Sequence, residues 1–274
     1  MLQSSNKMEV IIKGKEKEMG KKKLPAQFDE IIRPDIIKKV VVAQLANKRQ
    51  PYGAKPEAGK RPSAKVSRRR RDYRGSYGHG ISRVPRKVVS RSGTRFNWIG
   101  AFAPGTVGGR RAHPPKAEKI WSQKINIKEK RKAIRSAMAA AMNKDLVEKK
   151  GHLIPDKYPF IIATDIETIK TAKEARQFLI TIGLEKELGR IQEKSIRAGV
   201  GKMRGRKYKK VRGILIVVSQ KCDALRAFRN IPGVEARVVN TLSVEVLAPG
   251  TTPGRLTLFT EESINRVEKE KLFI

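Results

Sequence analysis

The chain has 274 residues, with 62 lysines and arginines against 26 acidic residues and a formal net charge of +36. A protein with this charge repels itself unless a polyanion neutralises it, which favours nucleic acid as the partner. Cys222 is the only cysteine, which excludes an intramolecular disulfide framework and suits a reducing compartment. Residues 1–20 show no signal-peptide pattern and no run approaches the ~18 apolar residues of a membrane span, so we expect an intracellular protein with no membrane partner.

The first third of the chain contains one strong helix signal. Residues 10–24 are predicted to form a short strand followed by a polar turn. Arg33-Pro34-Asp35 then opens a helix, because proline suits the first helical position, and this helix is predicted to end near Asn47. Its core-facing stripe is predicted to consist of Ile36, Ile37, Val40, Val41, Gln44 and Leu45.

The remainder of the chain, after residue 118, is predicted to alternate between helices and strands. A helix begins after Asn126, with Glu129 placed as in a capping box, and is predicted to run to about Lys150. The strands are predicted at 159–163, 214–218, 234–239 and 256–259, and the helices at 171–182, 184–196, 221–229, 242–247 and 261–271. This alternation gives right-handed crossovers and a covered sheet, so we predict an α/β fold, a three-layer sandwich with a mostly parallel sheet.

Residues 48–118 differ from the rest in composition. They hold 19 lysines and arginines against three acids, 10 of the 22 glycines and 7 of the 14 prolines. Proline forbids a continuous helix here, and the apolar residues are too few and irregular to bury a strand or helix face. Such a segment cannot offset its chain entropy alone, so we expect it to be disordered without a partner. We predict a globular domain of residues 1–47 and 119–274, with 48–118 inserted as a long, extended basic loop.

The chemistry of this loop points to RNA. Arginine outnumbers lysine 13 to 6, and a planar guanidinium suits phosphates and stacked bases. Aromatic side chains lie among the arginines, and unstacked bases stack on such rings. The Arg68–Arg71 run is also compatible with a nuclear-import signal or a solvated charge cluster. The predicted RNA-binding residues of the loop are Arg49, Tyr52, Arg61, Arg68, Arg69, Arg70, Arg71, Tyr73, Arg74, Tyr77, His79, Arg91, Arg95, Phe96, Trp98, Arg110, Arg111 and His113.

A second, shorter basic loop follows residue 196. It contains Gly199, Gly201 and Gly205, but the third glycine falls one place late for a dinucleotide-binding motif and Met203 replaces the Ser or Thr of a P-loop. We therefore predict a phosphate-binding loop that holds no cofactor. Its predicted RNA-binding residues are Arg197, Lys202, Arg204, Arg206 and Lys207.

No catalytic constellation is predicted. Cys222 lies in a helical pattern that indicates a packed thiol, and Asp165 and Glu167 are explained as a turn after a strand. None of the histidines has metal-ligand spacing to another histidine or to the cysteine; they are His79, His113 and His152. We expect no enzymatic activity, metal, cofactor or small-molecule substrate.

Several ordered segments resemble one known family. They are Arg33–Ile37 with Asn47–Tyr52, Arg83–Arg86, Gly108–Pro115, Asn126 with Glu129–Arg131, and Arg197–Gly199 with Gly201–Arg204. In these segments the chain resembles the large-subunit ribosomal protein four family, the universal L-four protein, in its archaeal and eukaryotic form. Val200 departs from the pattern, since a lysine is common there. The long basic C-terminal extension of eukaryotic members is absent, so the chain looks archaeal.

The resemblance implies a structural component of the large ribosomal subunit, cytoplasmic and ribosome-bound. The globular domain would lie on the outside of the subunit, and the loop would thread through ribosomal RNA to the wall of the polypeptide exit tunnel. The implied partners are large-subunit ribosomal RNA, neighbouring large-subunit proteins and the nascent polypeptide. The loop tip is expected within residues 75–100, with Arg83, Arg86 and Lys87 facing the tunnel.

Two alternatives remain open on the sequence. One is an α/β enzyme acting on RNA, a methyltransferase or nuclease, whose basic arm holds the substrate. Turnover or saturable nucleotide binding would favour it, while the absent cofactor loop argues against it. The other is a DNA-compacting protein, which would bind duplex DNA as tightly as folded RNA, although no recognition helix for the major groove is evident.

Overall fold

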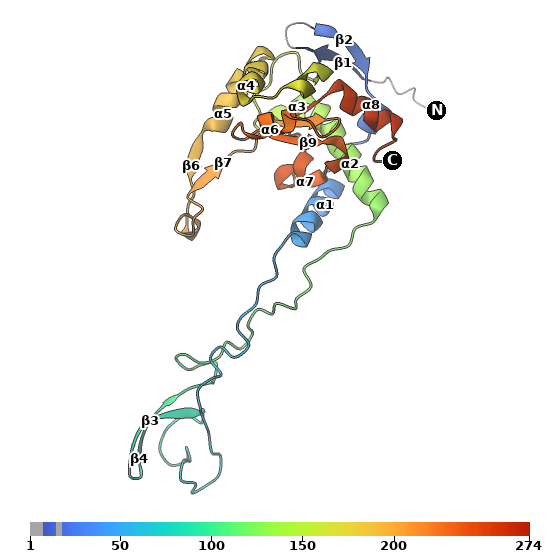
Figure 1. Ribbon diagram of the computed structural model, residues 1–274. Coiled ribbons are helices and arrows are strands. Elements are labelled where there is room, and N and C mark those ends of the chain that lie inside the picture. The colour runs from blue at the N-terminus through green and yellow to red at the C-terminus, as the bar shows by residue number, and fades with distance from the viewer. Residues whose placement is uncertain (1–7, 15–17) are drawn as a thin grey trace. The chain divides into compact units, whose positions relative to one another are not determined.

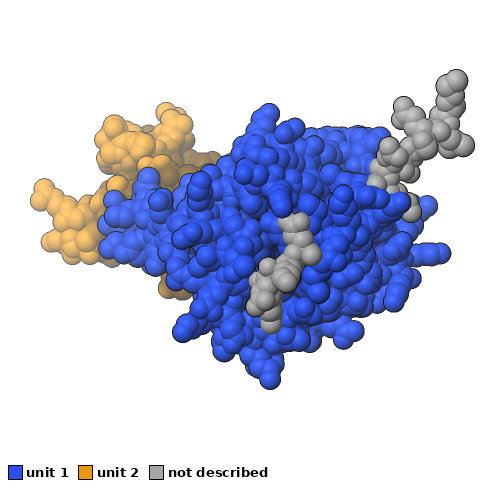
Figure 2. Space-filling model, turned by 90° about the horizontal axis from the view of Figure 1, so that it is seen from above, with its two compact units in different colours: residues 1–48, 122–274 blue, residues 49–121 orange. Residues whose placement is uncertain are grey.

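The structure is a computed structural model that describes residues 8–14 and 18–274. It divides into two compact units: unit 1 comprises residues 1–48 and 122–274, and unit 2 comprises residues 49–121 (Figure 2). Residues 1–7 and 15–17 lie outside the described residues. They fall within the predicted domain segment 1–47 and within residues 1–20, where the sequence shows no signal-peptide pattern.

Unit 1 contains all the helices that the structure describes and most of the strands (Figure 1). Its helices are α1 (Pro34–Asn47), α2 (Ile127–Met142), α3 (Lys144–Lys149), α4 (Ala172–Thr181), α5 (Glu185–Gln192), α6 (Ala224–Arg229), α7 (Val244–Leu247) and α8 (Glu261–Lys269). Its strands are β1 (Glu9–Lys13), β2 (Glu18–Lys23), β5 (Phe160–Ile162), β6 (Lys194–Ile196), β7 (Tyr208–Lys210), β8 (Leu215–Val218), β9 (Glu235–Val238) and β10 (Thr257–Phe259). Unit 2 contributes β3 (Arg86–Ser92) and β4 (Arg95–Gly100). Of the predicted α/β fold, the structure confirms a mixture of helices and small sheets.

The sheets of unit 1 are small. Strands β10, β8 and β9 form one sheet in that order, with both pairings parallel. Strands β2, β1 and β5 form another, in which β1 pairs parallel with β5 and antiparallel with β2. A single parallel bridge joins Ile162, at the end of β5, to Thr260, which follows β10. The short hairpin of β6 and β7 stands apart from both sheets.

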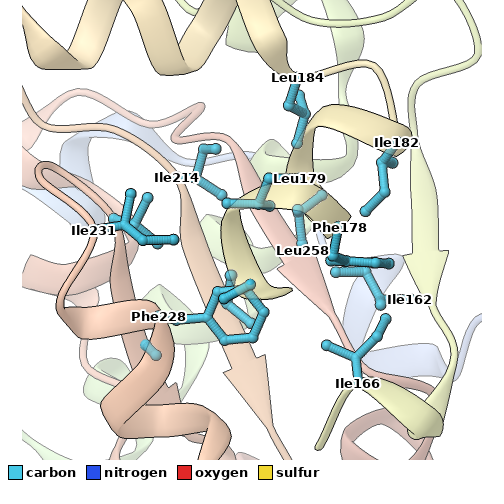
Figure 3. Packing of buried hydrophobic residues seen from close by; sticks show 14 of the residues in the cluster. Ile162, Ile166, Phe178, Leu179, Ile182, Leu184, Ile214, Phe228, Ile231 and Leu258 are labelled. Carbon is cyan, nitrogen blue, oxygen red and sulfur yellow. The ribbon is translucent and has the colours of Figure 1, made fainter. Parts of the chain in front are cut away.

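The core of unit 1 lies in two apolar clusters. Along the central stretch 214–218, Ile214, Ile216 and Val218 belong to the first cluster, whereas Leu215 and Val217 belong to the second. The first cluster draws on α4, α5 and α6, and Figure 3 shows part of its packing. The second draws on α1, α2, α7 and α8. Since successive side chains of a strand point to opposite faces, β8 is apolar on both faces, as its sequence predicts.

Two predicted helices are confirmed in detail. Helix α1 begins with Pro34 at its first position and ends at Asn47. Helix α4 follows Thr171, whose Oγ1 accepts a hydrogen bond from the Glu174 backbone N–H at 3.3 Å. Its predicted stop, Gly183, has a φ of +92°, a conformation that favours glycine. The predicted stripe of α1 is only partly correct, because Leu45 is exposed while Ala43 is buried.

Three other predictions are wrong. The helix after Asn126 ends at Met142, and a separate helix, α3, begins because the Asn143 Oδ1 accepts a hydrogen bond from the Leu146 N–H at 3.3 Å. Residues 194–196 form strand β6 instead of extending the preceding helix. The expectation that residues 48–118 form no strand also fails, because β3 and β4 pair there despite their largely exposed side chains.

Candidate nucleic-acid interface

The two ends of unit 2 are joined by aromatic and cationic side chains. Tyr52 stacks on Trp121 with ring centroids 5.9 Å apart and planes 21° from parallel. The Arg49 guanidinium carbon lies 3.9 Å from the Trp121 centroid, and the Lys119 ammonium lies 4.4 Å from it. A cation over an aromatic face is attracted by the ring quadrupole, so the charges and rings of this junction stabilise each other.

Backbone contacts continue this pairing along the unit. The Ala54 N–H donates to the Pro115 carbonyl at 2.9 Å. A Cβ added to Gly59 would lie 2.5 Å from the Gly109 carbonyl oxygen, and the φ of Gly59 is +73°. Glycine is therefore required at Gly59 both for its conformation and for the close approach of the two chain segments.

Farther along, β3 and β4 form an antiparallel hairpin with pairs from Arg86–Gly100 to Ser92–Arg95. The register shifts between Val88 and Ser90, so a bulge interrupts the ladder. Gly93, with a φ of +56°, lies in the connecting turn. A two-residue connection of this kind matches the twist of paired strands.

An arginine–aromatic cluster covers this hairpin. The Phe96 ring lies 5.2 Å from that of Tyr73, edge to face, and 6.1 Å from that of Trp98. The guanidinium carbons of Arg74 and Arg91 lie 5.1 and 5.4 Å from the Phe96 centroid. We define the arginine–aromatic cluster as Tyr73, Arg74, Arg86, Arg91, Phe96 and Trp98; Arg86 joins it at 5.6 Å from the Trp98 centroid.

Two further arginines of unit 2 lie over rings outside this cluster. The Arg83 guanidinium carbon is 4.7 Å from the Tyr77 centroid, and that of Arg110 is 5.9 Å from the Phe102 centroid. Neither pairing was identified from the sequence, although Arg110 and Tyr77 were predicted to bind RNA. A guanidinium over a ring face can still donate hydrogen bonds through the N–H groups at its edge, a geometry suited to phosphate.

The remaining predicted residues of unit 2 are exposed on its surface. Arg61 pairs with Glu57 at 3.6 Å. Ser67 lowers the pKa of Asp72 through a hydrogen bond from its side chain, in the segment next to the arginine run. The exposed residues without a ring contact described above are Arg68, Arg69, Arg70, Arg71, His79, Arg95, Arg111 and His113. Unit 2 as a whole has 19 lysines and arginines against three acids, so its field is strongly positive.

The residues predicted for the loop tip lie at the open end of the hairpin. Arg86 and Lys87 begin β3 opposite Gly100 and Ile99, and Arg83 precedes the strand. The Arg86 Nη2 donates to Ser82 Oγ at 3.1 Å. Their role at a tunnel wall stays a prediction.

The second basic loop belongs to unit 1 and is carried by the β6–β7 hairpin. The Arg197 N–H donates to the Lys207 carbonyl at 2.8 Å, and the Arg197 Nε donates to the Arg206 carbonyl at 3.1 Å. Gly199 and Gly205 have φ values of +75° and +77° at the two bends of the loop. The five predicted side chains, Arg197, Lys202, Arg204, Arg206 and Lys207, are all exposed.

The carboxyl ends of the parallel strands, where open α/β sheets bind substrates, are bridged by one carboxylate. Glu167, in the 3-10 helix η2 (Thr164–Thr168), accepts hydrogen bonds from the Ser219 N–H at 2.8 Å and from Thr260 Oγ1 at 2.7 Å. Asp165 is exposed. Glu167 therefore ties β8 to the end of β10, and the two acids do not form a catalytic pair.

The cysteine and the buried histidine, which were considered as catalytic or metal-binding residues, are also held in packing and hydrogen-bonding contacts. Cys222 packs against the first core cluster, and burial raises the pKa of its thiol. His152 is buried against Glu187, a contact that the sequence analysis missed because the two lie far apart in the chain. Within residues 8–14 and 18–274, no group of three or more His, Cys, Asp or Glu is arranged to hold a metal ion. In the same part of the chain, no helix is both long and apolar enough to cross a membrane.

An α/β body combined with a highly cationic unit of stacked arginines and rings is typical of a nucleic-acid-binding protein. The model of the ribosomal protein L4/L1 family matches residues 22–270. The chain is 48% identical to the large ribosomal subunit protein uL4 of Nanoarchaeum equitans, with 93% of this chain and 96% of that protein covered. It is 44% identical to that of Methanococcoides burtonii (91% and 93% covered) and 42% identical to that of Archaeoglobus fulgidus (88% and 90% covered). The chain therefore belongs to the ribosomal protein L4/L1 family.

Proposed function

We propose that this chain is a structural component of the large ribosomal subunit, bound to its RNA and to neighbouring ribosomal proteins in the cytoplasm. The observation that carries the proposal is the surface of unit 2, where guanidinium groups, among them that of the exposed Arg91, lie over aromatic rings in a segment with a large positive charge. Neutralising phosphates releases counterions, and the rings add stacking contacts with unpaired bases. The relatives reported above carry the name of a large-subunit protein, which supports the same assignment.

We infer that unit 2 is a loop inserted in the globular domain and that it threads through ribosomal RNA to the exit tunnel. In unit 1 the chain segments on either side of it are bonded together, since the Gln123 N–H donates to Asn47 Oδ1 at 2.7 Å. An extended excursion of ~35 residues each way at ~3.3 Å per residue spans at most about 115 Å, which is enough for deep penetration. Arg83, Arg86 and Lys87 are the residues we propose to face the nascent polypeptide.

The small sheets of unit 1 support a finer description of the fold. We infer that they form the middle layer of a three-layer sandwich with a mostly parallel sheet. The support is the alternation of residues 214–218 between two core clusters and the parallel bridge between Ile162 and Thr260. Helices on both faces are the usual cover of such a layer.

The alternative of an RNA-acting enzyme has no support, because the family to which the chain belongs is one of ribosomal proteins. The hydrogen bonds that Glu167 accepts across the carboxyl edge of the strands explain its position without catalysis. The DNA-compacting alternative remains distinguishable by experiment, since it requires equal affinity for duplex DNA and folded RNA.

Sedimentation of a cell lysate tests the proposal. We expect the protein to run with the large subunit and to stay there through a high-salt wash, because a segment enclosed by folded RNA is not released by screening alone. Release into the light fractions would indicate a peripheral electrostatic partner and would contradict the proposal. A competition between large-subunit RNA and duplex DNA for the purified chain then tests the DNA alternative.

A further inference from the structure

A cavity of about 690 Å³ lies in unit 1, at the amino ends of the parallel strands. Glu235 begins β9, and Arg255 lies two residues before β10. The C-terminal ends of α1 and α3 contribute Lys48 and Lys150, and β7 contributes Lys210. The cavity is therefore at the edge of the sheet opposite the one that Glu167 bridges.

The cavity is strongly cationic. Eight lysines and arginines line it, against two lining carboxylates, Glu235 and Glu245; Arg190, one of the eight, is already paired with Glu187 at 2.6 Å. The ends of α1 and α3 add only partial negative charges, roughly half a unit each. Lys48 pairs with Glu245, which accounts for one of the two carboxylates.

The other carboxylate, Glu235, is shared by three arginines. Its oxygens lie 2.9 Å from Arg237 Nη2, 3.0 Å from Arg255 Nη1 and 3.6 Å from Arg212 Nη1. One carboxylate neutralises one guanidinium, so this group carries a net charge of about +2 before Lys150 is counted.

The most buried of these arginines lacks a full set of partners. Arg255 is 1% exposed; its Nε donates to the Gly213 carbonyl at 2.9 Å and its Nη1 to the Val246 carbonyl at 2.7 Å, whereas its buried Nη2 has no hydrogen-bond partner. Burial lowers the pKa of Lys150 to about 8, and the charge of Arg255 acts in the same direction. The unpartnered Nη2 of Arg255 shows that this buried guanidinium lacks an acceptor on the cavity side chains.

We propose that this cavity binds a phosphate group. Guanidinium groups form paired hydrogen bonds with phosphate oxygens, and several cations around one concavity suit a doubly charged anion or successive phosphates of one strand. The phosphate has two possible sources, the backbone of RNA and the free ion, and the RNA source rests on the proposed function. The cavity is distinct from unit 2, so it anchors unit 1 independently.

The first arm of the test uses the purified full-length chain and sodium phosphate. At equal ionic strength, we expect phosphate to raise the melting temperature by about 3 °C more than sodium chloride does. The double variant Lys210→Gln/Arg212→Gln removes two exposed cations of the cavity and should lose this difference. The matched control, Lys173→Gln/Lys186→Gln, removes two exposed cations that do not line the cavity and should keep it.

The second arm measures the salt dependence of binding to large-subunit RNA. Each lost phosphate contact lowers the slope of log K against log[salt] by about 0.7–0.9, so the cavity variant should differ from the control by roughly 1–2. Circular dichroism and melting of each variant in chloride establish that it is folded.

The two arms together identify the source. If the cavity variant changes the salt dependence of RNA binding, the phosphate belongs to the RNA backbone. If phosphate raises the melting temperature but the salt dependence is unchanged, the ligand is the free ion. The proposal is overturned if phosphate acts only as chloride does and the cavity variant matches its control on RNA, as would occur if the cavity receives an acidic protein segment. Failure of the wild-type chain to sediment with the large subunit would remove the proposed function but leave the phosphate arm valid.

Discussion

Tyr52 and Trp121 stack with their planes 21° from parallel, near the two ends of unit 2, and Arg49 lies over both rings. The unit therefore closes on itself through a stack of a guanidinium and two rings. Such aromatic pairs contribute about 0.5–1.5 kcal/mol beyond the area they bury. The stack therefore adds to the backbone hydrogen bond between Ala54 and Pro115 in holding the two chain segments together.

Replacing Trp121 by alanine should loosen this junction. We expect the Ala54 N–H, which donates to the Pro115 carbonyl, to exchange with solvent roughly fivefold faster, as follows from a loss of about 1 kcal/mol. Hydrogen exchange followed by NMR measures this. Trp98→Ala, in the arginine–aromatic cluster, is the control and should leave the Ala54 amide unchanged. Equal protection of Ala54 in the wild type and in Trp121→Ala would show that the stack does not close the unit.

Replacing residues 49–121 by a short Gly/Ser linker should leave a domain that melts cooperatively. Lys48 and Ser122 belong to unit 1, and the side chain of Asn47 exchanges two hydrogen bonds with the backbone of Gln123, at 2.7 and 3.2 Å. Calorimetry should show a single transition. The variant Asn47→Ala in the same linker background should lower the stability by about 1 kcal/mol. A broad, non-cooperative transition of the linker protein would show that the boundary is wrong.

Asn143 should contribute its side-chain cap to α3. Replacing it by alanine leaves the Leu146 N–H without its acceptor and should destabilise the protein by about 1 kcal/mol. Asn143→Asp retains an acceptor oxygen at the N-cap and should remain close to the wild type. Urea unfolding of the three proteins measures the difference, and equal losses in both variants would exclude capping as the cause.

Glu187 should make the stability of the fold depend on acid pH. Burial disfavours its charge, but hydrogen bonds from Arg190, His152 and the Leu153 N–H outweigh this and hold the pKa of the carboxyl below its ordinary value of 4.5. A lowered folded pKa stabilises the protein above the unfolded pKa, and this contribution is lost as pH falls through the folded value.

The variant Glu187→Gln tests this contribution. At pH 7 it should cost about 3 kcal/mol, because it breaks a buried ion pair. Below pH 4 the difference from the wild type should shrink, as the wild-type carboxyl becomes protonated. Glu193→Gln, at an exposed site, should show neither effect. A difference that stays constant between pH 7 and pH 3 would contradict the assigned pKa shift.

The sequence predicted well where local signals and burial agree. Pro34 and Thr171 mark helix starts that the structure confirms, and the apolar run 214–218 is a central strand. The prediction of helix ends failed where a single side-chain hydrogen bond sets the boundary. At Asn143 neither glycine nor proline marks the break between α2 and α3. The strands β3 and β4 were missed because their stability comes from pairing and ring contacts and not from a buried face.

For the candidate sites too, the sequence predicted what local composition determines and missed what depends on contacts between distant residues. Composition was sufficient to single out residues 48–118 as the basic segment, but not to assign each guanidinium to a ring. The sequence offered one signal for the cavity, the isolated charge of Arg255 just before an apolar strand. This charge was not interpreted as part of a binding site. Its meaning depends on Glu235 and Lys150, which are distant in sequence and are brought together only by the fold.

If unit 2 binds RNA as proposed, the arginines that lie over its rings would exchange partners on binding. At several rings a guanidinium lies over a face that a nucleobase could cover, as at Phe96 with Arg74 and Arg91. When a base takes that face, the displaced guanidinium is free to bind a phosphate of the same strand. The number of ring faces in contact with a partner then stays the same, because each base replaces a guanidinium on its ring. The net driving force of binding would come from the counterions that RNA releases when these arginines neutralise its phosphates, so binding should depend on ionic strength more than on base identity.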